Sequence, residues 1–309
     1  MIILTLQEYV DSLKGRRIAV LGIGVSNTPL IDLLLKNDLP LTVCDMRTEE
    51  ALGDAAAALR ARGAQLRLGP GYLDDLDGFD YIFRTPGLLP TDPALVKAKA
   101  RGAVVTSEME IFFRLCPCRT IGITGSDGKT TTSSIIAELL KAAGRRVHLG
   151  GNIGTPLLCE IPDFQPDDIA VLELSSFQLH SINIRPDVAV ITNVSPNHLD
   201  KHPDFDDYVN AKRQIFANQT ADDVLVVNRD NAYTARFGEE AKSRVLYFSR
   251  KETLSDGVFC RNGMIYRSHN YEVESIIPES EILLPGVHNV ENYMAAFAAV
   301  DGVVSPEMC

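Results

Sequence analysis

Short apolar segments rich in valine and isoleucine alternate with longer segments of helical spacing along most of this 309-residue chain. This alternation is typical of βαβ units, in which a helix follows each strand and crosses back over a parallel sheet. It therefore predicts an α/β protein with mainly parallel sheets. The expected strands cover residues 17–21, 41–44, 80–83, 119–124, 147–149, 169–172, 188–192, 224–227 and 245–248. The expected helices cover residues 26–36, 49–62, 131–143 and 289–300.

A second start in the pattern follows Thr106. Ser107 is a good helix-capping residue, and Glu108 and Glu110 place negative charge in the first turn of the helix that it would begin. The chain length also fits two domains of about 150 residues each. We therefore expect one domain over residues 1–106 and another over residues 107–309.

The formal net charge of −11 falls almost entirely within residues 107–309. An acidic surface excludes nucleic acid and anionic membrane as the main partners, although local basic pockets remain possible. The apolar runs are too short to span a bilayer, and no basic residue precedes Lys14 as a secretory signal would require. The six cysteines show no framework spacing. These features predict a cytoplasmic protein with reduced thiols.

The segment from Thr124 to Thr131 reads TGSDGKTT and lies between an expected strand and an expected helix. Glycines let backbone amides turn toward phosphate oxygens, and the helix N-terminus adds partial positive charge. Lys129 would contact the outer phosphates, and the Thr130 hydroxyl would bind Mg²⁺. The strict phosphate-loop spacing requires glycine where Ile123 stands, so this is a shortened variant. The alternative is a glycine-rich turn with a solvated lysine.

A second glycine turn, Gly22-Ile23-Gly24, follows the first expected strand, and Asp45 ends the second. This arrangement resembles a dinucleotide site, but Asn27 replaces the third glycine of that motif. Three interpretations remain open here: an NAD site, a site for another nucleotide, and a purely structural turn.

Polar residues follow two other expected strands and one glycine loop. Glu173 ends one strand, His198 lies in the segment 195–202 after another, and Asn152 lies in the loop GGNIG. A carboxylate at the carboxyl edge of a parallel sheet is where a metal ligand is expected when a phosphate loop shares that edge. The alternatives are that Glu173 only starts a helix and that His198 is structural.

Together these segments resemble the Mur ligase family. The loop GITGSDGKTTT is shared with the wider superfamily that includes folylpolyglutamate ligases, whereas LELSSFQL is similar to the members that add D-glutamate. The stretches NVSPNHLDKH and LPGVHNVENYMAAFAAV agree with this, and the resemblance covers residues 14–302 in order.

The resemblance implies a Rossmann-like N-terminal domain followed by a P-loop-type ATPase α/β domain. Members of the family carry a third, C-terminal domain, which the resemblance does not find here. We therefore expect this chain by itself to bind nucleotides without completing ligation.

The resemblance also assigns residues. It implies contacts to the uridine nucleotide of UDP-N-acetylmuramoyl-L-alanine from Gly24, Val25, Ser26, Asp45, Arg47, Thr85, Pro86 and Gly87, and further contacts to that substrate from Asn152, Ser175 and His198. It implies ATP contacts from Gly125, Ser126, Asp127, Gly128, Lys129, Thr130, Thr131, Asn289 and Asn292. It implies Mg²⁺ ligands at Thr130, Glu173, His198 and a carbamylated Lys212, with catalytic roles for Lys129, His198 and Lys212.

The implied activity is an ATP-dependent amide ligase of peptidoglycan synthesis. It would use ATP, two Mg²⁺ ions, D-glutamate and UDP-N-acetylmuramoyl-L-alanine, and we expect a monomer that binds neither nucleic acid nor membrane. The alternatives are a non-catalytic nucleotide-binding module, an NAD-dependent oxidoreductase and a folylpolyglutamate synthase. Asn27 speaks against the oxidoreductase, and LELSSFQL speaks against the folylpolyglutamate synthase.

Overall fold

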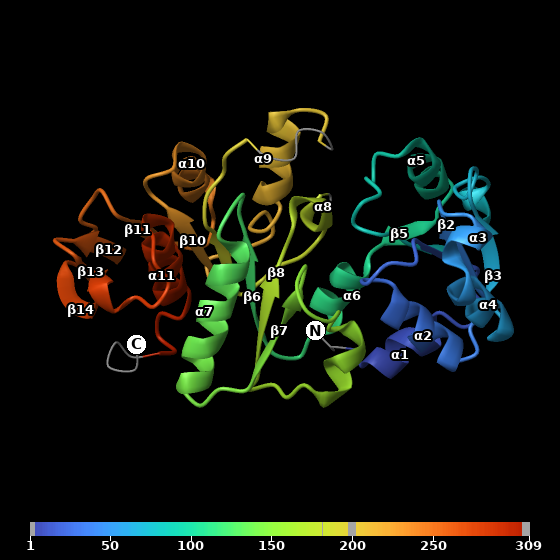
Figure 1. Ribbon diagram of the computed structural model, residues 1–309, viewed down its shortest axis with the longest axis horizontal. Helices are drawn as coiled ribbons and strands as arrows, with labels where there is room; N and C mark the ends of the chain where they lie inside the picture. Colours follow the sequence, from blue (N-terminus) through green and yellow to red (C-terminus); the bar gives the residue numbers. More distant parts are fainter. Residues whose placement is uncertain (1–3, 181, 197–201, 305–309) are drawn as a thin grey trace. The chain divides into compact units, whose positions relative to one another are not determined.

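The computed structural model describes residues 4–180, 182–196 and 202–304 (Figure 1). The chain forms two compact units. Unit 1 comprises Met1–Pro117 and Thr155–Phe164, and unit 2 comprises Cys118–Gly154 and Gln165–Cys309. Because unit 1 also includes a segment from later in the chain, the domain boundary at residue 106 stays a prediction.

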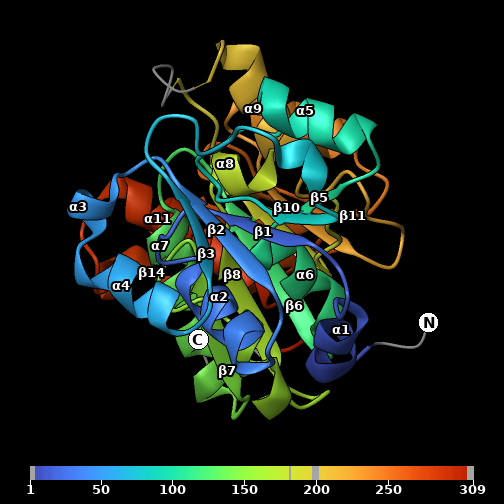
Figure 2. The same cartoon turned by 90° about the vertical axis from the view of Figure 1, so that its right-hand side faces the viewer.

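Unit 1 contains a five-stranded parallel sheet in the order β3-β2-β1-β4-β5. Figure 2 shows β1, β2 and β3 side by side. The strands are β1 (Ile18–Leu21), β2 (Leu41–Asp45), β3 (Gln65–Leu68), β4 (Tyr81–Phe83) and β5 (Val104–Thr106). All four β1 residues are buried, as expected for a central strand covered on both faces. The order reverses at β1, so ligands are expected at the carboxyl ends of β1 and its neighbours.

The helices of unit 1 agree with the sequence pattern in part. They are α1 (Leu6–Ser12), α2 (Thr28–Lys36), α3 (Glu49–Leu52), α4 (Asp54–Ala61), α5 (Pro93–Ala100) and α6 (Glu108–Leu115), with 3-10 turns η1 (Leu76–Gly78) and η2 (Leu158–Asp163). The expected helix over 49–62 is two helices, because Gly53 between them has φ 51°, outside the helical region. Ser107 caps α6 as predicted, since its hydroxyl accepts a hydrogen bond from the Glu110 amide.

Unit 2 contains a nine-stranded sheet in the order β14-β13-β12-β11-β10-β9-β6-β8-β7. Its strands are β6 (Arg119–Thr124), β7 (Val147–Gly151), β8 (Ile169–Glu173), β9 (Val188–Ile191), β10 (Val224–Asn228), β11 (Arg244–Ser249), β12 (Gly257–Arg261), β13 (Met264–His269) and β14 (Glu272–Pro278). The strands from β7 to β12 are parallel, whereas β12, β13 and β14 pair antiparallel. The mainly parallel α/β class is thus confirmed.

The helices of unit 2 surround the central strands. They are α7 (Lys129–Ala142), α8 (Ser176–Leu179), α9 (Phe205–Arg213), α10 (Ala232–Glu240) and α11 (Val287–Ala299), with the 3-10 turn η3 (Glu279–Glu281). Figure 1 shows α7 and α11 near each other, and the two helices are in contact. Ile136 and Leu140 of α7 and Met294 and Phe297 of α11 are buried in one core that also includes Val190. This core fixes the start of both helices at the carboxyl edge of the sheet.

Among the described residues, no helix has both the length and the apolar content that crossing a membrane requires.

Candidate functional site

The phosphate loop of unit 2 joins β6 to α7, as the sequence predicted. The helix begins at Lys129, two residues earlier than expected, and Gly128 precedes it with φ 82°. Lys129, Thr130 and Thr131 therefore form the first turn of a 14-residue helix. The backbone amides of a first turn have no partner within the helix and are available to an anion.

Two glycines of this loop are required by close neighbours. A Cβ on Gly125 would lie 1.9 Å from Thr192 Oγ1, and a Cβ on Gly128 would lie 2.2 Å from Asn292 Oδ1. Real Cβ atoms do not approach other atoms so closely, and Gly128 also has a positive φ. The segment after β9 and the first turns of α11 thus pack directly against the loop.

The loop is held in shape by hydrogen bonds to the segment that follows β9. Thr192 Oγ1 donates to the Asp127 carbonyl at 2.6 Å, and Asn193 Nδ2 donates to the same carbonyl at 3.1 Å. Asn193 Oδ1 accepts from the Asp127 amide at 3.1 Å, and Ser126 Oγ donates to the Ser195 carbonyl at 2.9 Å. Thr192 and Asn193 were not predicted as site residues, although they directly follow the strand β9. The loop is therefore preformed.

Lys129 folds back over this loop. Its Nζ donates to the carbonyls of Gly125 at 3.1 Å and Ser126 at 3.0 Å. Burial lowers the pKa of Lys129, while the nearby carboxylates of Glu173 and Asp127 oppose that decrease. The ammonium group is thus at the loop, where an outer phosphate would replace carbonyl oxygens as its partner.

Thr130, Glu173 and Asn152 meet at the carboxyl edge of β7 and β8. Thr130 Oγ1 donates to Glu173 Oε2 at 2.6 Å, and Asn152 Nδ2 donates to Glu173 Oε1 at 2.9 Å. The Asn152 amide also donates to the Glu173 carbonyl at 2.7 Å. Three residues that are far apart in the sequence are therefore brought together beside the phosphate loop.

The oxygens of Thr130 and Glu173 fit a magnesium ion. Mg²⁺ prefers hard oxygen ligands and usually combines one or two carboxylates with phosphate oxygens and water. Within the described ranges, no group of three or more His, Cys, Asp or Glu could hold a metal without such additional ligands. The predicted ligand His198 lies outside the described residues.

Lys212 reaches the same loop from α9. Its side chain is almost fully buried, and its Nζ donates to the Gly125 carbonyl at 2.7 Å. The ammonium lies 4.4 Å from the centre of the Tyr208 ring. Burial, reinforced by the positive charge of Lys129, lowers the pKa of Lys212 to about 7. A neutral amine is therefore accessible near neutral pH, and carbamylation requires that form.

Asn289 and Asn292 lie in the first turns of α11, next to the phosphate loop. Asn292 Oδ1 accepts from Thr132 Oγ1 at 3.3 Å, and Asn292 Nδ2 donates to Asn289 Oδ1 at 3.1 Å. Asn289 Nδ2 donates to the Pro285 carbonyl at 2.8 Å. These bonds link α11 to α7 close to where the two helices begin.

Ser175 already has a structural role. It caps α8, since its hydroxyl accepts from the Gln178 amide while Gln178 Oε1 accepts from the Ser175 amide at 3.0 Å. This reciprocal capping box orients the segment that follows Glu173. Its predicted substrate contact stays a prediction.

Unit 1 has its own pocket at the carboxyl ends of its strands, with a volume of about 330 Å³. Of the predicted residues, Gly24, Asp45, Arg47 and Thr85 line it. Sequence reasoning missed four further lining residues, Leu21, Met46, Tyr72 and Leu88. The other predicted residues lie in adjoining turns: Val25 and Ser26 precede α2, and Pro86 and Gly87 follow β4.

Asp45 organises this pocket. Its Oδ2 accepts from the Ile23 amide at 2.7 Å and from Arg47 Nη2 at 2.8 Å. Its Oδ1 accepts from the Arg47 amide and Arg47 Nε, both at 2.9 Å. Burial alone would raise the pKa of Asp45, but the bonds from Arg47 and the Ile23 amide outweigh it and lower the pKa to about 2. The ionised carboxylate thus fixes the glycine turn after β1.

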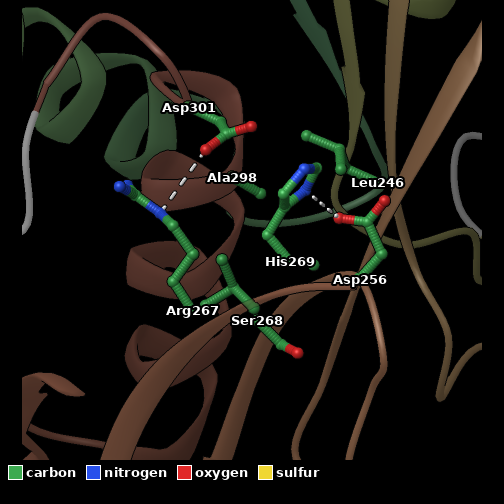
Figure 3. A pocket seen from close by; sticks show the side chains of 9 residues that line it. Leu246, Asp256, Arg267, Ser268, His269, Ala298 and Asp301 are labelled. Carbon is green, nitrogen blue, oxygen red and sulfur yellow. Dashed lines mark hydrogen bonds and ion pairs between the residues drawn. The ribbon is translucent and has the colours of Figure 1, made fainter. Parts of the chain in front are cut away.

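A smaller cavity of unit 2 is not a nucleotide site (Figure 3). Its volume of about 10 Å³ is room for one water molecule at most. Its charged side chains also pair with one another, since Arg267 Nε lies 3.6 Å from Asp301 Oδ1 and His269 Nδ1 lies 3.3 Å from Asp256 Oδ1.

Comparison with known proteins gives two matching family models. Residues 16–107 match the Mur ligase MurD-like N-terminal domain, and residues 123–300 match the Mur ligase middle domain. Two curated relatives are both called UDP-N-acetylmuramoylalanine–D-glutamate ligase. The relative from Ruminiclostridium cellulolyticum is 49% identical over 98% of this chain and 65% of its own length. The relative from Acetivibrio thermocellus is 48% identical over 96% of this chain and 63% of its own length. The chain thus spans a little under two thirds of these relatives.

Two solved structures share the fold. One is the UDP-N-acetylmuramate:L-alanyl-gamma-D-glutamyl-meso-diaminopimelate ligase from Neisseria meningitides, with a TM-score of 0.57 and 18% identity over 92% of this chain and 93% of that protein. The other is a murein peptide ligase from Psychrobacter arcticus, with a TM-score of 0.53 and 16% identity over 95% of this chain and 67% of that protein.

Proposed function

Because this chain belongs to the Mur ligase family, we propose that it carries the nucleotide sites of an ATP-dependent ligase of peptidoglycan synthesis. The reaction would join D-glutamate to UDP-N-acetylmuramoyl-L-alanine, as the names of the 49% and 48% identical relatives state for those proteins. The observation that carries the proposal is the group Thr130, Glu173 and Asn152 held beside a preformed phosphate loop.

The chemistry explains why such a loop is needed. A carboxylate is a poor acyl electrophile, so the terminal carboxylate of the substrate would first take the γ-phosphoryl group of ATP and become an acyl phosphate. The amine of D-glutamate would then attack the acyl carbon, and phosphate would leave. Phosphoryl transfer depends mainly on positioning and on stabilising dispersed negative charge.

The residues of unit 2 would divide these tasks. The amides of the first turn of α7 would hold the phosphates, and Lys129 would leave its carbonyl partners to bind the outer phosphate. Thr130 and Glu173 would hold one Mg²⁺ ion, and a carbamylated Lys212 with His198 would hold a second. Bound Mg²⁺ would neutralise phosphate charge. Asn289 and Asn292 would lie beside the adenine.

The pocket of unit 1 would hold the uridine nucleotide. The Gly22–Gly24 turn and Thr85 offer backbone and hydroxyl groups, and Tyr72, Met46 and Leu88 offer apolar surface for a base. We further propose that the protein is a cytoplasmic monomer, in keeping with its acidic surface and scattered cysteines.

A product assay on the full-length protein tests this proposal. UDP-N-acetylmuramoyl-L-alanine, Mg²⁺ and ATP are incubated with D-glutamate, with L-glutamate or without an amino acid, and the products are separated by mass. We expect the amide product, and one phosphate released per molecule of product, only with D-glutamate. Equal product formation with L-glutamate would contradict the assigned substrate, and ligation without ATP would contradict the mechanism.

A further inference from the structure

A buried chain of hydrogen bonds joins α8 to α9 behind the phosphate loop. His202 Nδ1 lies 2.6 Å from Asp207 Oδ2, and His202 Nε2 lies 2.9 Å from Ser176 Oγ. The other oxygen of Asp207 lies 2.9 Å from His180 Nε2. One carboxylate on α9 therefore binds two imidazoles, and one of those imidazoles also binds the first residue of α8.

The His202 ring is immobilised by its neighbours. Its side chain is 0% exposed. The Phe177 ring stacks on it with centroids 4.9 Å apart, and the Tyr208 ring meets it edge to face at 5.2 Å. An imidazole enclosed in this way has a fixed position for both of its nitrogens.

The partners of His202 assign its tautomer. A carboxylate only accepts hydrogen bonds, so Nδ1 carries a proton toward Asp207, and in the neutral ring Nε2 accepts from the Ser176 hydroxyl. Asp207 is in the first turn of α9, where the helix dipole stabilises its negative charge. Burial opposes ionisation, but the bonds from His202 and His180 leave the pKa of Asp207 below its ordinary value.

Asp207 is also next to the residues that reach the phosphate loop. Tyr208 OH lies 3.0 Å from Ser126 Oγ, and the Lys212 ammonium lies over the Tyr208 ring and binds the Gly125 carbonyl. On the other side, Ser176 is three residues after Glu173, which ends β8. The chain of bonds thus connects α8, which begins three residues after Glu173, to the helix that carries Lys212.

Ser176, His202 and Asp207 are hydrogen-bonded in the same sequence as the three residues of a serine hydrolase triad. The burial of Ser176 excludes that role. Ser176 is only 3% exposed, so a substrate has no access to its hydroxyl. A nucleophile must reach the atom it attacks. The arrangement instead suits a fixed connection between two elements.

We propose that His202 and Asp207 are positioning residues that set the distance between Glu173 and Lys212, and thereby set the affinity of the phosphate loop for ATP in the presence of Mg²⁺. This inference rests on the proposed function. Residues that orient metal ligands typically contribute about 10–100-fold to metal affinity. Removing the connection should therefore weaken ATP binding mainly when Mg²⁺ is present, because the amides of the first turn of α7 would hold phosphate without the metal.

The test uses the 309-residue chain and isothermal titration calorimetry with ATP, with and without Mg²⁺. Asp207→Asn removes the charge that binds both imidazoles, and Ser176→Ala removes only the bond to His202. The matched control is His148→Asn, because His148 Nε2 lies 2.8 Å from Asp168 Oδ2 at the opposite, amino edge of the same sheet. Thermal unfolding of each variant measures the purely structural loss.

We expect Asp207→Asn to weaken ATP binding about tenfold with Mg²⁺ and less than twofold without it. We expect Ser176→Ala to show a smaller loss of the same kind, and His148→Asn to lower the melting temperature without changing ATP affinity. Equal ATP affinity in folded Asp207→Asn and wild type would overturn the inference alone. No binding of Mg²⁺-ATP by the wild type would instead overturn the proposed function of this loop.

A second measurement holds even if Asp207→Asn does not fold. Nitrogen-15 spectra of the wild-type histidines report which imidazole nitrogen carries the proton. We expect His202 protonated at Nδ1, with its signal changed by Ser176→Ala. A His202 protonated at Nε2 alone would contradict the connection.

Discussion

Replacing Asp45 by asparagine tests how unit 1 builds its pocket. The carboxylate accepts four hydrogen bonds, one from the Ile23 amide and three from the amide and guanidinium of Arg47. Asparagine has nearly the same shape, but it is neutral and turns an NH₂ group toward these donors. The variant therefore removes the charge and places an NH₂ donor opposite the N–H donors of Ile23 and Arg47. It opens no cavity.

The pKa of Asp45 gives the magnitude. It lies at about 2, compared with about 3.9 in an unfolded chain. At about 1.4 kcal/mol per pKa unit, the carboxylate contributes at most about 2.6 kcal/mol to the free energy of unfolding at pH 7. The Arg47 side chain is 48% exposed, so solvent screens part of the interaction. We expect Asp45→Asn to cost about 1–2 kcal/mol.

The sign of the pH dependence follows from the lowered pKa. The stabilisation by Asp45 is fully present above about pH 4 and is lost as the pH falls through the folded pKa near 2. The difference between wild type and variant should therefore be about half as large at pH 3 as at pH 7. Urea unfolding at both pH values measures it, with fluorescence of the tyrosines because the chain has no tryptophan.

Asp80→Asn is the matched control. Asp80 also accepts from the amide and guanidinium of one arginine, Arg17, but this pair is at the amino edge of the sheet of unit 1 and is more exposed. We expect Asp45→Asn to weaken binding of UDP-N-acetylmuramoyl-L-alanine and Asp80→Asn to leave it unchanged. The reasoning is refuted if Asp45→Asn is as stable as wild type at pH 7, or if the difference does not shrink at pH 3.

Three further predictions concern unit 2. Lys129→Ala should abolish measurable ATP binding and leave binding of UDP-N-acetylmuramoyl-L-alanine within twofold of wild type, because the two nucleotides would bind in different units. Calorimetry with each ligand measures this, and an equal loss of affinity for both would contradict separate sites. Gly128→Ala should destabilise the protein by about 1–3 kcal/mol and prevent ATP binding, because the new Cβ would lie 2.2 Å from Asn292 Oδ1 at a residue with positive φ. Chemical unfolding measures the loss of unfolding free energy, and a variant as stable as wild type would refute the close packing. Glu173→Gln keeps the shape of the side chain but removes the charge beside Thr130, so ATP affinity should fall at least about tenfold with Mg²⁺ and little without it. Calorimetry with Mg²⁺ and with a chelator compares the two conditions, and an equal loss of affinity in both would argue that Glu173 is not a metal ligand.

The sequence predicted the parallel core of both units because central strands are apolar on both faces and each is followed by a helix. It missed β12, β13 and β14 of unit 2 and the edge strands β3 and β5 of unit 1, none of which contains a run of four apolar residues. A signal was present: Asn262-Gly263 separates β12 from β13, and both residues have positive φ. Asparagine followed by glycine is a strong hairpin turn signal.

Site residues that belong to one contiguous motif were predicted. Site residues that the fold brings in from distant segments were missed. The loop from Gly125 to Thr130 is contiguous, so its chemistry can be read directly from the sequence. Thr192 and Tyr208 reach this loop from segments more than 60 residues away, and only the strand order places them there. Tyr72 lines the pocket of unit 1 for the same reason, since no local pattern marks it.

Transfer of labelled oxygen tests the proposed ligase reaction most directly. UDP-N-acetylmuramoyl-L-alanine with ¹⁸O in its terminal carboxylate is incubated with the full-length protein, Mg²⁺, ATP and D-glutamate, and the released phosphate is examined by mass spectrometry. An acyl phosphate intermediate requires that one carboxylate oxygen leave with the phosphate, so we expect one ¹⁸O atom per phosphate released. Amide formation with unlabelled phosphate, or phosphate release without any amide, would contradict the account.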